Sequence, residues 1–359
     1  MHPSTYVEIS RAALRHNAKA VCQSVDVPVI GVVKCNGYGV SVKEAYEAWR
    51  DAGVTMFAVS QPQEAIELRR DGCESDILLM CPVADRETLL SLLENRIILT
   101  VSNLENGRFY SSVAADMPIR AHMAVDTGMG RFGIHWTDIS QIRSIYALPG
   151  FSFEGIFSHF SASFEERYQQ TKNQLTRFLQ VTDQLQAEGY SVGMRHIANS
   201  CAALRFPETR LDGVRIGSAL VGRLPAPVPV ELETVGVFRA KVVDRRCLLP
   251  GDTTGYGSYC TLKKRTEVII VALGSEAGFG LTAKPDRLRS RDLAVYVYRL
   301  LQDWRSAAFV RHRGRKVPVV GRIGSQYTLC NAAGIDAQPG DWVEWNGSLL
   351  LSTCERIFV

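Results

Sequence analysis

The sequence predicts an α/β protein in which an N-terminal (β/α)8 TIM barrel is followed by a C-terminal, mainly-β domain. From residue 29 to 216, apolar runs alternate with amphipathic stretches, and the pattern repeats eight times. Eight strand–helix repeats are the number that closes a parallel barrel. After about residue 226 the pattern changes to short β-branched runs separated by turn residues, which indicates a β-domain. We therefore expect the barrel in residues 1–226 and the β-rich domain in residues 227–359.

The apolar runs give the expected strands, and the amphipathic stretches between them give the helices. Barrel strands are expected near residues 29–34, 55–59, 76–80, 97–101, 119–125, 153–158, 192–197 and 211–216. Helices are expected before the first strand, over residues 10–24, and between strands, for example over 42–52, 61–70 and 169–186. In the second domain, strands are expected over 237–243, 267–273, 317–323 and 342–350. Strong helix formers at helical spacing predict one inserted helix near residues 290–304.

Composition excludes several classes of protein. The chain of 359 residues is 46% hydrophobic and 22% charged, which is ordinary for a soluble enzyme. Its net charge is +4, and the basic residues do not form a continuous stripe, so no nucleic acid partner is expected. No apolar stretch has the length of a membrane span, and the N-terminus lacks a signal core, so we expect a cytoplasmic protein with no membrane partner. Nine scattered cysteines without ligand spacing predict free thiols and no metal site.

Lys34 directly follows a strand that is expected to be buried, Val29–Val33, and glycines at 37 and 39 indicate a turn after it. A lysine there either extends into solvent or serves chemistry, because desolvation lowers the pKa of an amine and makes it a nucleophile or base. Active sites of barrels lie at the carboxyl ends of the strands. Four more polar residues fall at such ends: His159, Asn199, Ser200 and Arg215.

Several segments carry a more specific signal, in a fixed order along the chain. They are Lys34-Cys35-Asn36-Gly37-Tyr38-Gly39, Ala58-Val59-Ser60 with the helix Glu64–Arg69, Asp126-Thr127-Gly128-Met129-Gly130-Arg131, Gly155–Phe160, His196–Ser200 and Val214–Gly217. With these motifs the chain resembles the alanine racemase family, over nearly its whole length and most strongly up to about residue 260. The resemblance implies a fold-type III enzyme dependent on pyridoxal 5′-phosphate (PLP), an isomerase of D-amino acid metabolism, and a homodimer.

The resemblance also implies roles for barrel residues. Lys34 would be the Schiff-base lysine and one catalytic base, and His159 would stack on the pyridine ring. Arg215 would contact the pyridine nitrogen, and Arg131 would contact the phenolic oxygen and the substrate carboxylate. The remaining expected cofactor-binding residues are Tyr38, Asn199, Ser200, Gly217 and Ser218. His196 is either a residue behind these or a core histidine with its own partner.

The chain departs from the family on the substrate side. Members place a tyrosine from the partner subunit in a Gly-Tyr-Ala-Asp-Gly motif, and the aligned run here is Gly274-Ser275-Glu276-Ala277-Gly278. A Cys-Met-Asp motif becomes Gly324-Ser325-Gln326, and Ala124 stands where many members have a lysine. Ser275 and Ser325 are therefore the residues expected to reach the substrate from the partner chain.

Racemisation by two bases needs one base on each face of Cα, and a lone serine is a poor proton acceptor. Three explanations are open. Another residue replaces the tyrosine, with Tyr256, Tyr259, Cys260 and Glu276 nearby in sequence; or the substrate is different; or the protein does not carry out two-base racemisation. We expect an amino-acid racemase acting on alanine or a serine-like substrate. The alternatives are a PLP-dependent lyase or decarboxylase, or a PLP-binding protein that has lost racemase turnover.

Overall fold

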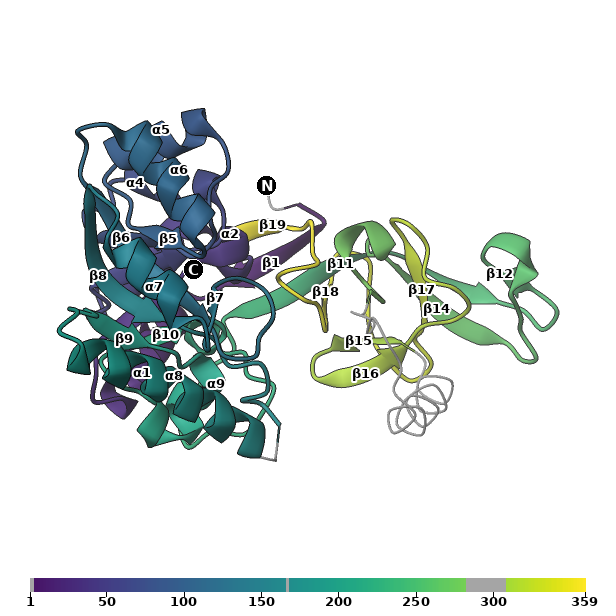
Figure 1. Cartoon of the computed structure of the whole chain (residues 1–359). Helices are drawn as coiled ribbons and strands as arrows, with labels where there is room; N and C mark the ends of the chain where they lie inside the picture. Colours follow the sequence, from purple (N-terminus) through teal and green to yellow (C-terminus); the bar gives the residue numbers. More distant parts are fainter. Residues whose placement is uncertain (1–2, 166–167, 282–307) are drawn as a thin grey trace. The chain divides into compact units, whose positions relative to one another are not determined.

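The computed structural model describes residues 3–165, 168–281 and 308–359 (Figure 1). They form two compact units. One is Arg11–Val235, and the other combines the described residues up to Ser10 with those from Gly236 to Val359. The helix expected near residues 290–304 lies outside the described residues.

The unit Arg11–Val235 contains a closed barrel of eight parallel strands. These are β2 (Val29–Val32), β3 (Met56–Val59), β4 (Asp76–Leu79), β5 (Leu99–Val101), β6 (Ile119–Asp126), β8 (Phe151–Phe157), β9 (Met194–His196) and β10 (Val214–Ile216). They pair in the orders β10-β2-β3-β4 and β5-β6-β8-β9, and a short strand β7 (Ile134–His135) adds to β6. Parallel bridges Leu78–Ile98 and His196–Gly213 join the two sets on both sides, so the barrel closes. The predicted fold class is confirmed.

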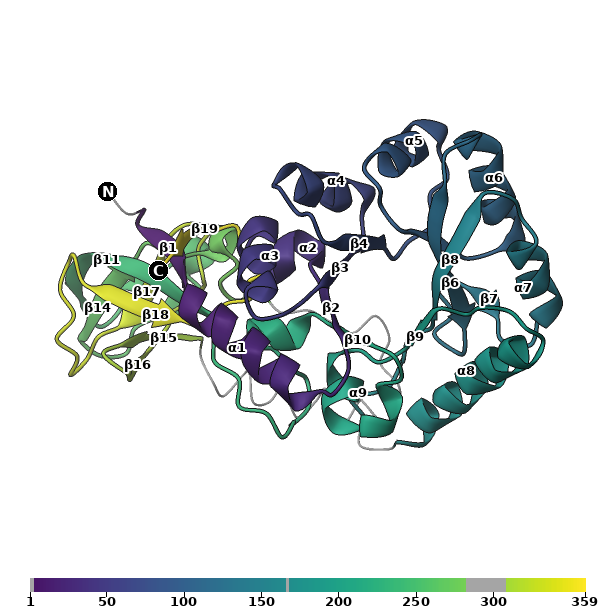
Figure 2. The same cartoon turned by 90° about the vertical axis from the view of Figure 1, so that its left-hand side faces the viewer.

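Helices cover the outside of the barrel, and Figure 2 shows most of this ring. They are α1 (Arg11–Ser24), α3 (Val42–Arg50), α4 (Pro62–Arg70), α5 (Arg86–Glu94), α6 (Leu104–Ala114), α7 (Ile139–Tyr146), α8 (Gln169–Ala187) and α9 (Ser200–Arg205), with 3-10 turns η1 (Pro207–Thr209) and η2 (Ser218–Val221). The short segment α2 (Lys34–Tyr38) is instead a turn with left-handed backbone that follows β2. Helix α3 shows why they form. Its buried residues Val42, Ala45, Tyr46, Ala48 and Trp49 lie on one side of the helix, which packs toward the strands.

The inside of the barrel is a packed core. Ile30, Val32, Ala58, Leu78 and Ile98 form one buried cluster contributed by neighbouring strands. Burying a side chain of the size of Ile30 stabilises the fold by roughly 1.5–3 kcal/mol, so this layer holds the strands in register. The barrel is therefore filled, and a site can form only at an end of the strands.

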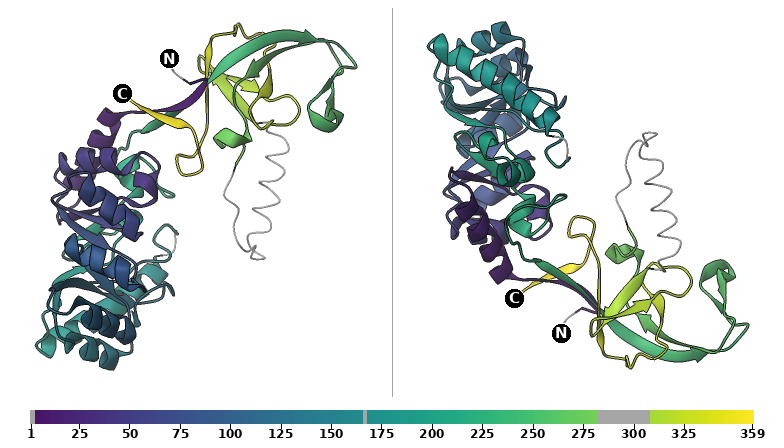
Figure 3. Two further views of the ribbon diagram at one scale, coloured as in Figure 1. Left: turned by 90° about the horizontal axis from the view of Figure 1, so that it is seen from above. Right: turned by 90° about the horizontal axis from the view of Figure 1, so that it is seen from below.

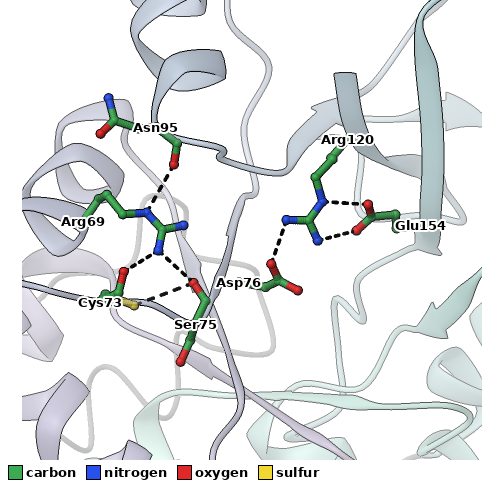
Figure 4. Close-up of polar contacts among 7 residues, drawn as sticks. All are labelled: Arg69, Cys73, Ser75, Asp76, Asn95, Arg120 and Glu154. Atoms are coloured by element: carbon green, nitrogen blue, oxygen red, sulfur yellow. Dashed lines mark hydrogen bonds and ion pairs between the residues drawn. The ribbon is translucent and has the colours of Figure 1, made fainter. Parts of the chain in front are cut away.

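The amino ends of the strands are fastened by ion pairs (Figure 4). Arg120 of β6 donates to both carboxylate oxygens of Glu154 on β8 at 2.7 and 2.8 Å, and to Asp76 of β4 at 2.7 Å. Nearby, Arg69 of α4 donates to the backbone carbonyls of Ser75 and Asn95 at 3.1 and 3.2 Å. These contacts bridge three strands and one helix at the end that does not carry the expected site.

The second unit is a β-domain, and Figure 3 shows its long strand β11 beside β1. Its strands are β1 (Thr5–Ile9), β11 (Gly236–Leu248), β12 (Thr253–Thr254), β13 (Cys260–Thr261), β14 (Thr266–Val271), β15 (Phe309–His312), β16 (Arg315–Pro318), β17 (Thr328–Asn331), β18 (Trp342–Trp345) and β19 (Glu355–Phe358), with 3-10 turns η3 (Tyr256–Ser258) and η4 (Ser275–Ala277). The main sheet has the order β16-β15-β18-β11-β1-β19, and β14 joins β11 to β17.

The division of the chain differs from the expected boundary at residue 226. The first unit continues to Val235, and the described residues before Arg11 belong with the second unit. The reason is strand pairing, because Thr5–Ile9 is antiparallel to β11 and parallel to β19. Two strands are also shorter than expected: β16 ends at Pro318, and β18 ends at Trp345. Among the described residues, no helix combines the length and the apolar character needed to span a membrane.

Candidate active site

The carboxyl ends of the barrel strands surround a cavity of about 310 Å3. It lies at the end of the barrel opposite the Arg120 ion pairs. All nine barrel residues expected in the site line this cavity: Lys34, Tyr38, Arg131, His159, Asn199, Ser200, Arg215, Gly217 and Ser218. They come from loops that are far apart in sequence, so the barrel brings them together.

Lys34 starts an unusual turn. The residues after it, Cys35, Asn36, Gly37 and Tyr38, all have positive φ, between 52° and 64°. Left-handed backbone costs an ordinary residue about 1–2 kcal/mol, so three such residues need outside support. Glu64 of α4 supplies it. One carboxylate oxygen of Glu64 accepts from the Cys35 N–H at 2.6 Å, and the other accepts from Ser60 and Gln61 at 3.0 and 3.1 Å.

Tyr38, Ser200 and Gly217 form a small cradle beside Lys34. The Ser200 hydroxyl accepts from the Gly217 N–H at 3.1 Å. A Cβ at position 217 would overlap the Tyr38 hydroxyl, so only glycine lets this phenol approach the backbone. Burial, with smaller contributions from Cys35 and Glu64, raises the pKa of Tyr38. Its hydroxyl therefore stays protonated and can donate to an anion such as a phosphate.

Asn199 and Ser218 flank this cradle. Asn199 is the N-cap of α9, because its side-chain oxygen accepts from the Ala202 N–H at 3.1 Å and from the Ser163 hydroxyl at 2.8 Å. Ser218 is the first residue of η2, directly after Gly217. The first turns of α9 and η2 therefore border the cavity. The hydroxyl and backbone N–H groups of these turns favour the binding of an anion.

Arg215 of β10 is buried, with 3% of its surface exposed. Nη1 donates to Nδ1 and to the backbone oxygen of His196 at 2.7 and 3.0 Å. Nη2 donates to the Ser158 oxygen at 2.6 Å and to His159 Nδ1 at 2.9 Å. Burial, and secondly the charge of Arg131, lowers the pKa of Arg215 to about 9, so it remains a cation at neutral pH. Its Nε is buried and has no hydrogen-bond partner among the described residues.

His159 is held neutral by its surroundings. Burial lowers its pKa, and the cations Arg215, Arg131 and Lys34 lower it further. Because the guanidinium of Arg215 can only donate, His159 Nδ1 accepts, and the proton of the ring is on Nε2. The His159 ring is therefore uncharged, has a fixed orientation and forms part of the cavity wall.

Arg131 lies in the loop after β6, and that loop is wound around one carboxylate. Asp126 Oδ1 accepts from the N–H groups of residues 128, 129 and 130 at 2.9, 2.9 and 3.1 Å. Burial opposes ionisation of Asp126, but these donors prevail and lower its pKa. Arg177 of α8 donates to the Thr127 oxygen at 2.9 Å, which fixes the loop from behind. The Arg131 guanidinium itself is exposed and lies 5.8 Å from the ring centre of Phe132.

The two altered motifs of the second unit meet each other. The Ser275 N–H donates to the Gly324 oxygen at 2.9 Å, and the Glu276 N–H donates to the Ser325 oxygen at 3.0 Å. Gln326 donates to the Glu276 carboxylate at 3.0 Å. We call residues 274–278 with 324–326 the Ser275 platform. Its side chains Ser275, Glu276, Ser325 and Gln326 are all exposed.

Comparisons with known proteins agree with this geometry. Residues 9–225 match the family profile described as alanine racemase, N-terminal domain. An alanine racemase of Desulforamulus reducens is 32% identical over 333 residues, which are 90% of this chain and 84% of that protein. The chain belongs to the alanine racemase family. It is accordingly a PLP-dependent amino-acid racemase, which is an isomerase.

Solved structures of alanine racemases share the fold across both units. An alanine racemase of Clostridium difficile superposes with a TM-score of 0.88 over 100% of this chain and 96% of that one, at 24% identity. The alanine racemase of Bacillus anthracis, solved with bound L-Ala-P, gives a TM-score of 0.85 at 25% identity and covers 100% of this chain and 96% of its own. The likeness therefore includes the β-domain, where the substrate-side motifs differ.

The cavity fits the PLP of alanine racemases on three observations. The unpartnered Arg215 Nε is a buried donor that suits a ring nitrogen with a free lone pair. The glycine at 217 keeps space for a phosphate beside Tyr38 and Ser200. Among the described residues that line the cavity, Lys34 alone supplies a lysine amine.

Two residues that hold this site were not among those expected from the sequence. In the sequence Glu64 stands out only as part of an expected helix, although its three N–H donors come from two loops of the site. His122 of β6 is not among the residues that the sequence motifs single out, yet it hydrogen-bonds His196 at 2.8 Å inside the barrel. A histidine within an apolar strand is the only sequence signal for it. His196 itself proves to be the residue behind Arg215.

Proposed function

We propose that this racemase uses Lys34, Arg131, His159 and Arg215 as its catalytic residues. The observation that carries the proposal is their convergence on one cavity, together with Tyr38, Asn199, Ser200, Gly217 and Ser218 as cofactor-binding residues. Bound PLP supplies an electron-withdrawing ring that makes the Cα–H of an amino acid acidic.

We assign each side chain around that ring a separate role. Lys34 Nζ binds the cofactor and moves the Cα proton on one face. The Tyr38 hydroxyl and the turn at Gly217 and Ser218 bind the phosphate. Arg215 Nε would donate to the ring nitrogen and, as a cation, would keep a proton off it. Arg131 orients the substrate carboxylate from its wound loop.

For the opposite face of Cα we propose the Ser275 platform of a partner subunit. Exposed apolar side chains around the barrel cavity support a homodimer: Met129, Phe132 and Phe164 are 37%, 44% and 51% exposed and line the cavity. Apolar surface at the mouth of a polar site is typical of an interface. Sedimentation of the loaded protein tests this, and a monomer with full activity would contradict the shared site.

We propose alanine or a serine-like amino acid as the substrate. Serines at 275 and 325 replace larger residues of the family motifs, which leaves space and hydroxyl groups for a polar side chain. Among the candidates for the second base, Glu276 is the strongest, because it is next to Ser275 on the same platform and carries a carboxylate. Tyr256 and Tyr259 lie on the β12–β13 hairpin, with 93% and 62% of their surfaces exposed.

One observation favours a second function. The serine at 275 is itself a poor proton acceptor near neutral pH, so without Glu276 acting as the base the site would support one-sided chemistry. That site would serve a lyase or decarboxylase, or a PLP-binding protein without racemase turnover.

Incubation of the loaded protein with single L-amino acids in deuterium oxide separates these functions. Deuterium at Cα together with the D-isomer supports the racemase. Deuterium with retention of the L-form supports a one-base enzyme. Loss of the carboxylate or of the side chain supports a decarboxylase or lyase, and no change with any substrate supports a binding protein.

A further inference from the structure

A row of buried neutral rings continues from Arg215 into the barrel. Arg215 Nη1 is 2.7 Å from His196 Nδ1, and His196 Nε2 is 2.8 Å from His122 Nδ1. His196 and His122 are 0% and 2% exposed, so water does not compete for these bonds. The row links the carboxyl end of β10 to the middle of β6.

The direction of each hydrogen bond in the row follows from the guanidinium of Arg215, which is the first group of the row. A guanidinium has five N–H donors and no acceptor, so His196 Nδ1 must accept. The single proton of a neutral His196 is then on Nε2 and is donated to His122 Nδ1. His122 in turn carries its own proton on Nε2. The tautomer of His196 with its proton on Nε2 therefore serves both neighbours, because it accepts from Arg215 at Nδ1 and donates to His122 at Nε2.

Both rings are neutral in this arrangement. Burial lowers the pKa of His122 to about 3, with further lowering by Arg215 and Arg120 and an opposing contribution from Asp76. Burial also lowers the pKa of His196, and Arg215 and His122 add to that effect. The contacts of Arg215 are all to uncharged atoms, so it is a buried cation held by dipoles, and the orientation of those dipoles matters.

Close packing restricts the His122 ring to one position. A Cβ at Gly155 would lie 2.6 Å from His122 Cε1, so the glycine of β8 makes the space for this ring. Phe157 stacks on His196 with ring centres 5.2 Å apart, and the Arg215 guanidinium lies 5.1 Å from the same Phe157 ring. The ion pairs of Arg120 in Figure 4 close the end of the barrel beyond His122.

We propose that His122 is a positioning residue for the reaction: by accepting from His196 Nε2, it locks the His196 tautomer that holds Arg215 with Nε free to face the cofactor. Without this acceptor, the Nε2–H of His196 is a buried donor that has lost its partner, which costs about 1–3 kcal/mol, and this penalty favours the tautomer with the proton on Nδ1. When it moves to Nδ1, it meets an N–H of Arg215, and the two donors repel each other. Arg215 then loses its fixed direction. This inference rests on the proposed role of Arg215 toward the PLP ring nitrogen.

The direct test is the tautomer itself. Nitrogen-15 NMR of the holoenzyme labelled at histidine reports which ring nitrogen carries the proton, and it does not depend on turnover. We expect Nε2–H for His196 and His122 in the wild type, and an Nδ1–H signal for His196 in His122→Leu. His122→Asn keeps an acceptor near the position of Nδ1, so it should restore the wild-type tautomer.

Activity and spectra give the second readout. The His122→Leu holoenzyme should lose on the order of 10²-fold in kcat, as expected for a misdirected catalytic group, and its PLP absorption should vary with pH differently from wild type. Tyr110→Phe is the matched control, because it removes a buried hydroxyl that bonds the Val83 N–H and the Thr100 oxygen in the same barrel without touching the row. It should lower thermal stability but leave tautomers and spectrum unchanged.

The outcomes separate this inference from the proposed function. A wild-type His196 protonated on Nδ1, or an unchanged tautomer and spectrum in His122→Leu, would overturn the inference even if the enzyme racemises. The expected tautomers in a protein without racemase turnover would keep the row intact and overturn the proposed function alone. If His122→Leu does not fold, the wild-type and His122→Asn spectra still decide the tautomer.

Discussion

The barrel mouth and the Ser275 platform differ in how completely they keep the chemistry of their family. The mouth has all the expected cofactor residues, and two of its loops are held by carboxylates: Glu64 binds the turn after Lys34, and Asp126 binds the loop before Arg131. The platform keeps its backbone pairing between residues 275 and 324 but has lost the tyrosine. The expected cofactor residues and the expected second-face residues therefore lie on different structural elements, so variants can test the two separately.

Removing the cofactor lysine should have the largest effect at the barrel mouth. Lys34→Ala should abolish racemisation, since loss of a positioned base alone costs about 10²–10⁴ in rate and the cofactor also loses its covalent attachment. Borohydride reduction and peptide mapping of wild type should place the pyridoxyl label on Lys34. Lys43→Ala, on the exposed side of α3, is the control and should behave as wild type. A label on another lysine would reject the assignment.

Restoring the tyrosine at position 275 tests whether the Ser275 platform lacks the second acid–base group. Ser275→Tyr should raise the rate of D-alanine formation by up to about 10²–10⁴, because a phenol can serve as the second acid–base group. Ser275→Ala should leave the wild-type rate unchanged. A large loss in Ser275→Ala would mean that Ser275 itself takes part in proton transfer. A wild-type rate typical of the family would instead point to Glu276, which Glu276→Gln then tests.

Weakening the clamp under Lys34 should give an intermediate effect. Glu64→Gln leaves one acceptor oxygen for three N–H groups, and a hydrogen bond to a charged group contributes roughly 1.5–3 kcal/mol. We expect PLP affinity, measured by equilibrium titration of the apoenzyme, to fall by about 10- to 100-fold. Glu67→Gln on the exposed side of the same helix is the control. Equal affinities for the two variants would show that the left-handed turn does not need Glu64.

The smallest effect should come from the opposite end of the barrel. Arg120 lowers the pKa of Asp76, against an opposing contribution from burial. Because the folded-state pKa is below the unfolded value of about 3.9, the stabilisation is complete at neutral pH and is lost as pH falls through the lowered pKa. Asp76 is half exposed, so Asp76→Asn should cost no more than about 1 kcal/mol at pH 7. Urea unfolding at pH 7 and at about pH 3 should show that difference shrink on acidification, with exposed Glu87→Gln as control.

Most of the barrel could be predicted from the sequence because its signals are local. Each strand is an apolar run next to an amphipathic helix, as with Met56–Val59 before α4. Strand β1 was missed because its partners begin at Gly236 and Glu355, and no local pattern reveals pairing over such separations. The same holds for inserted polar residues. Lys34 can be recognised in the sequence because it lies at the end of an apolar strand. The role of His122 becomes visible only in the structure, where β9 places His196 beside it.

The pairing of β1 also sets an order of events during synthesis. Thr5–Ile9 leaves the ribosome before the barrel, but it can pair only after β11, more than two hundred residues later. At about 5–20 residues per second, this strand waits on the order of ten to fifty seconds with its backbone unpaired. The barrel thus has time to close before the β-domain can form, and a chaperone that engages the nascent chain would meet β1 as an exposed strand. An obstruction placed on these residues would therefore delay the unit that carries Ser275, not the unit that holds Lys34.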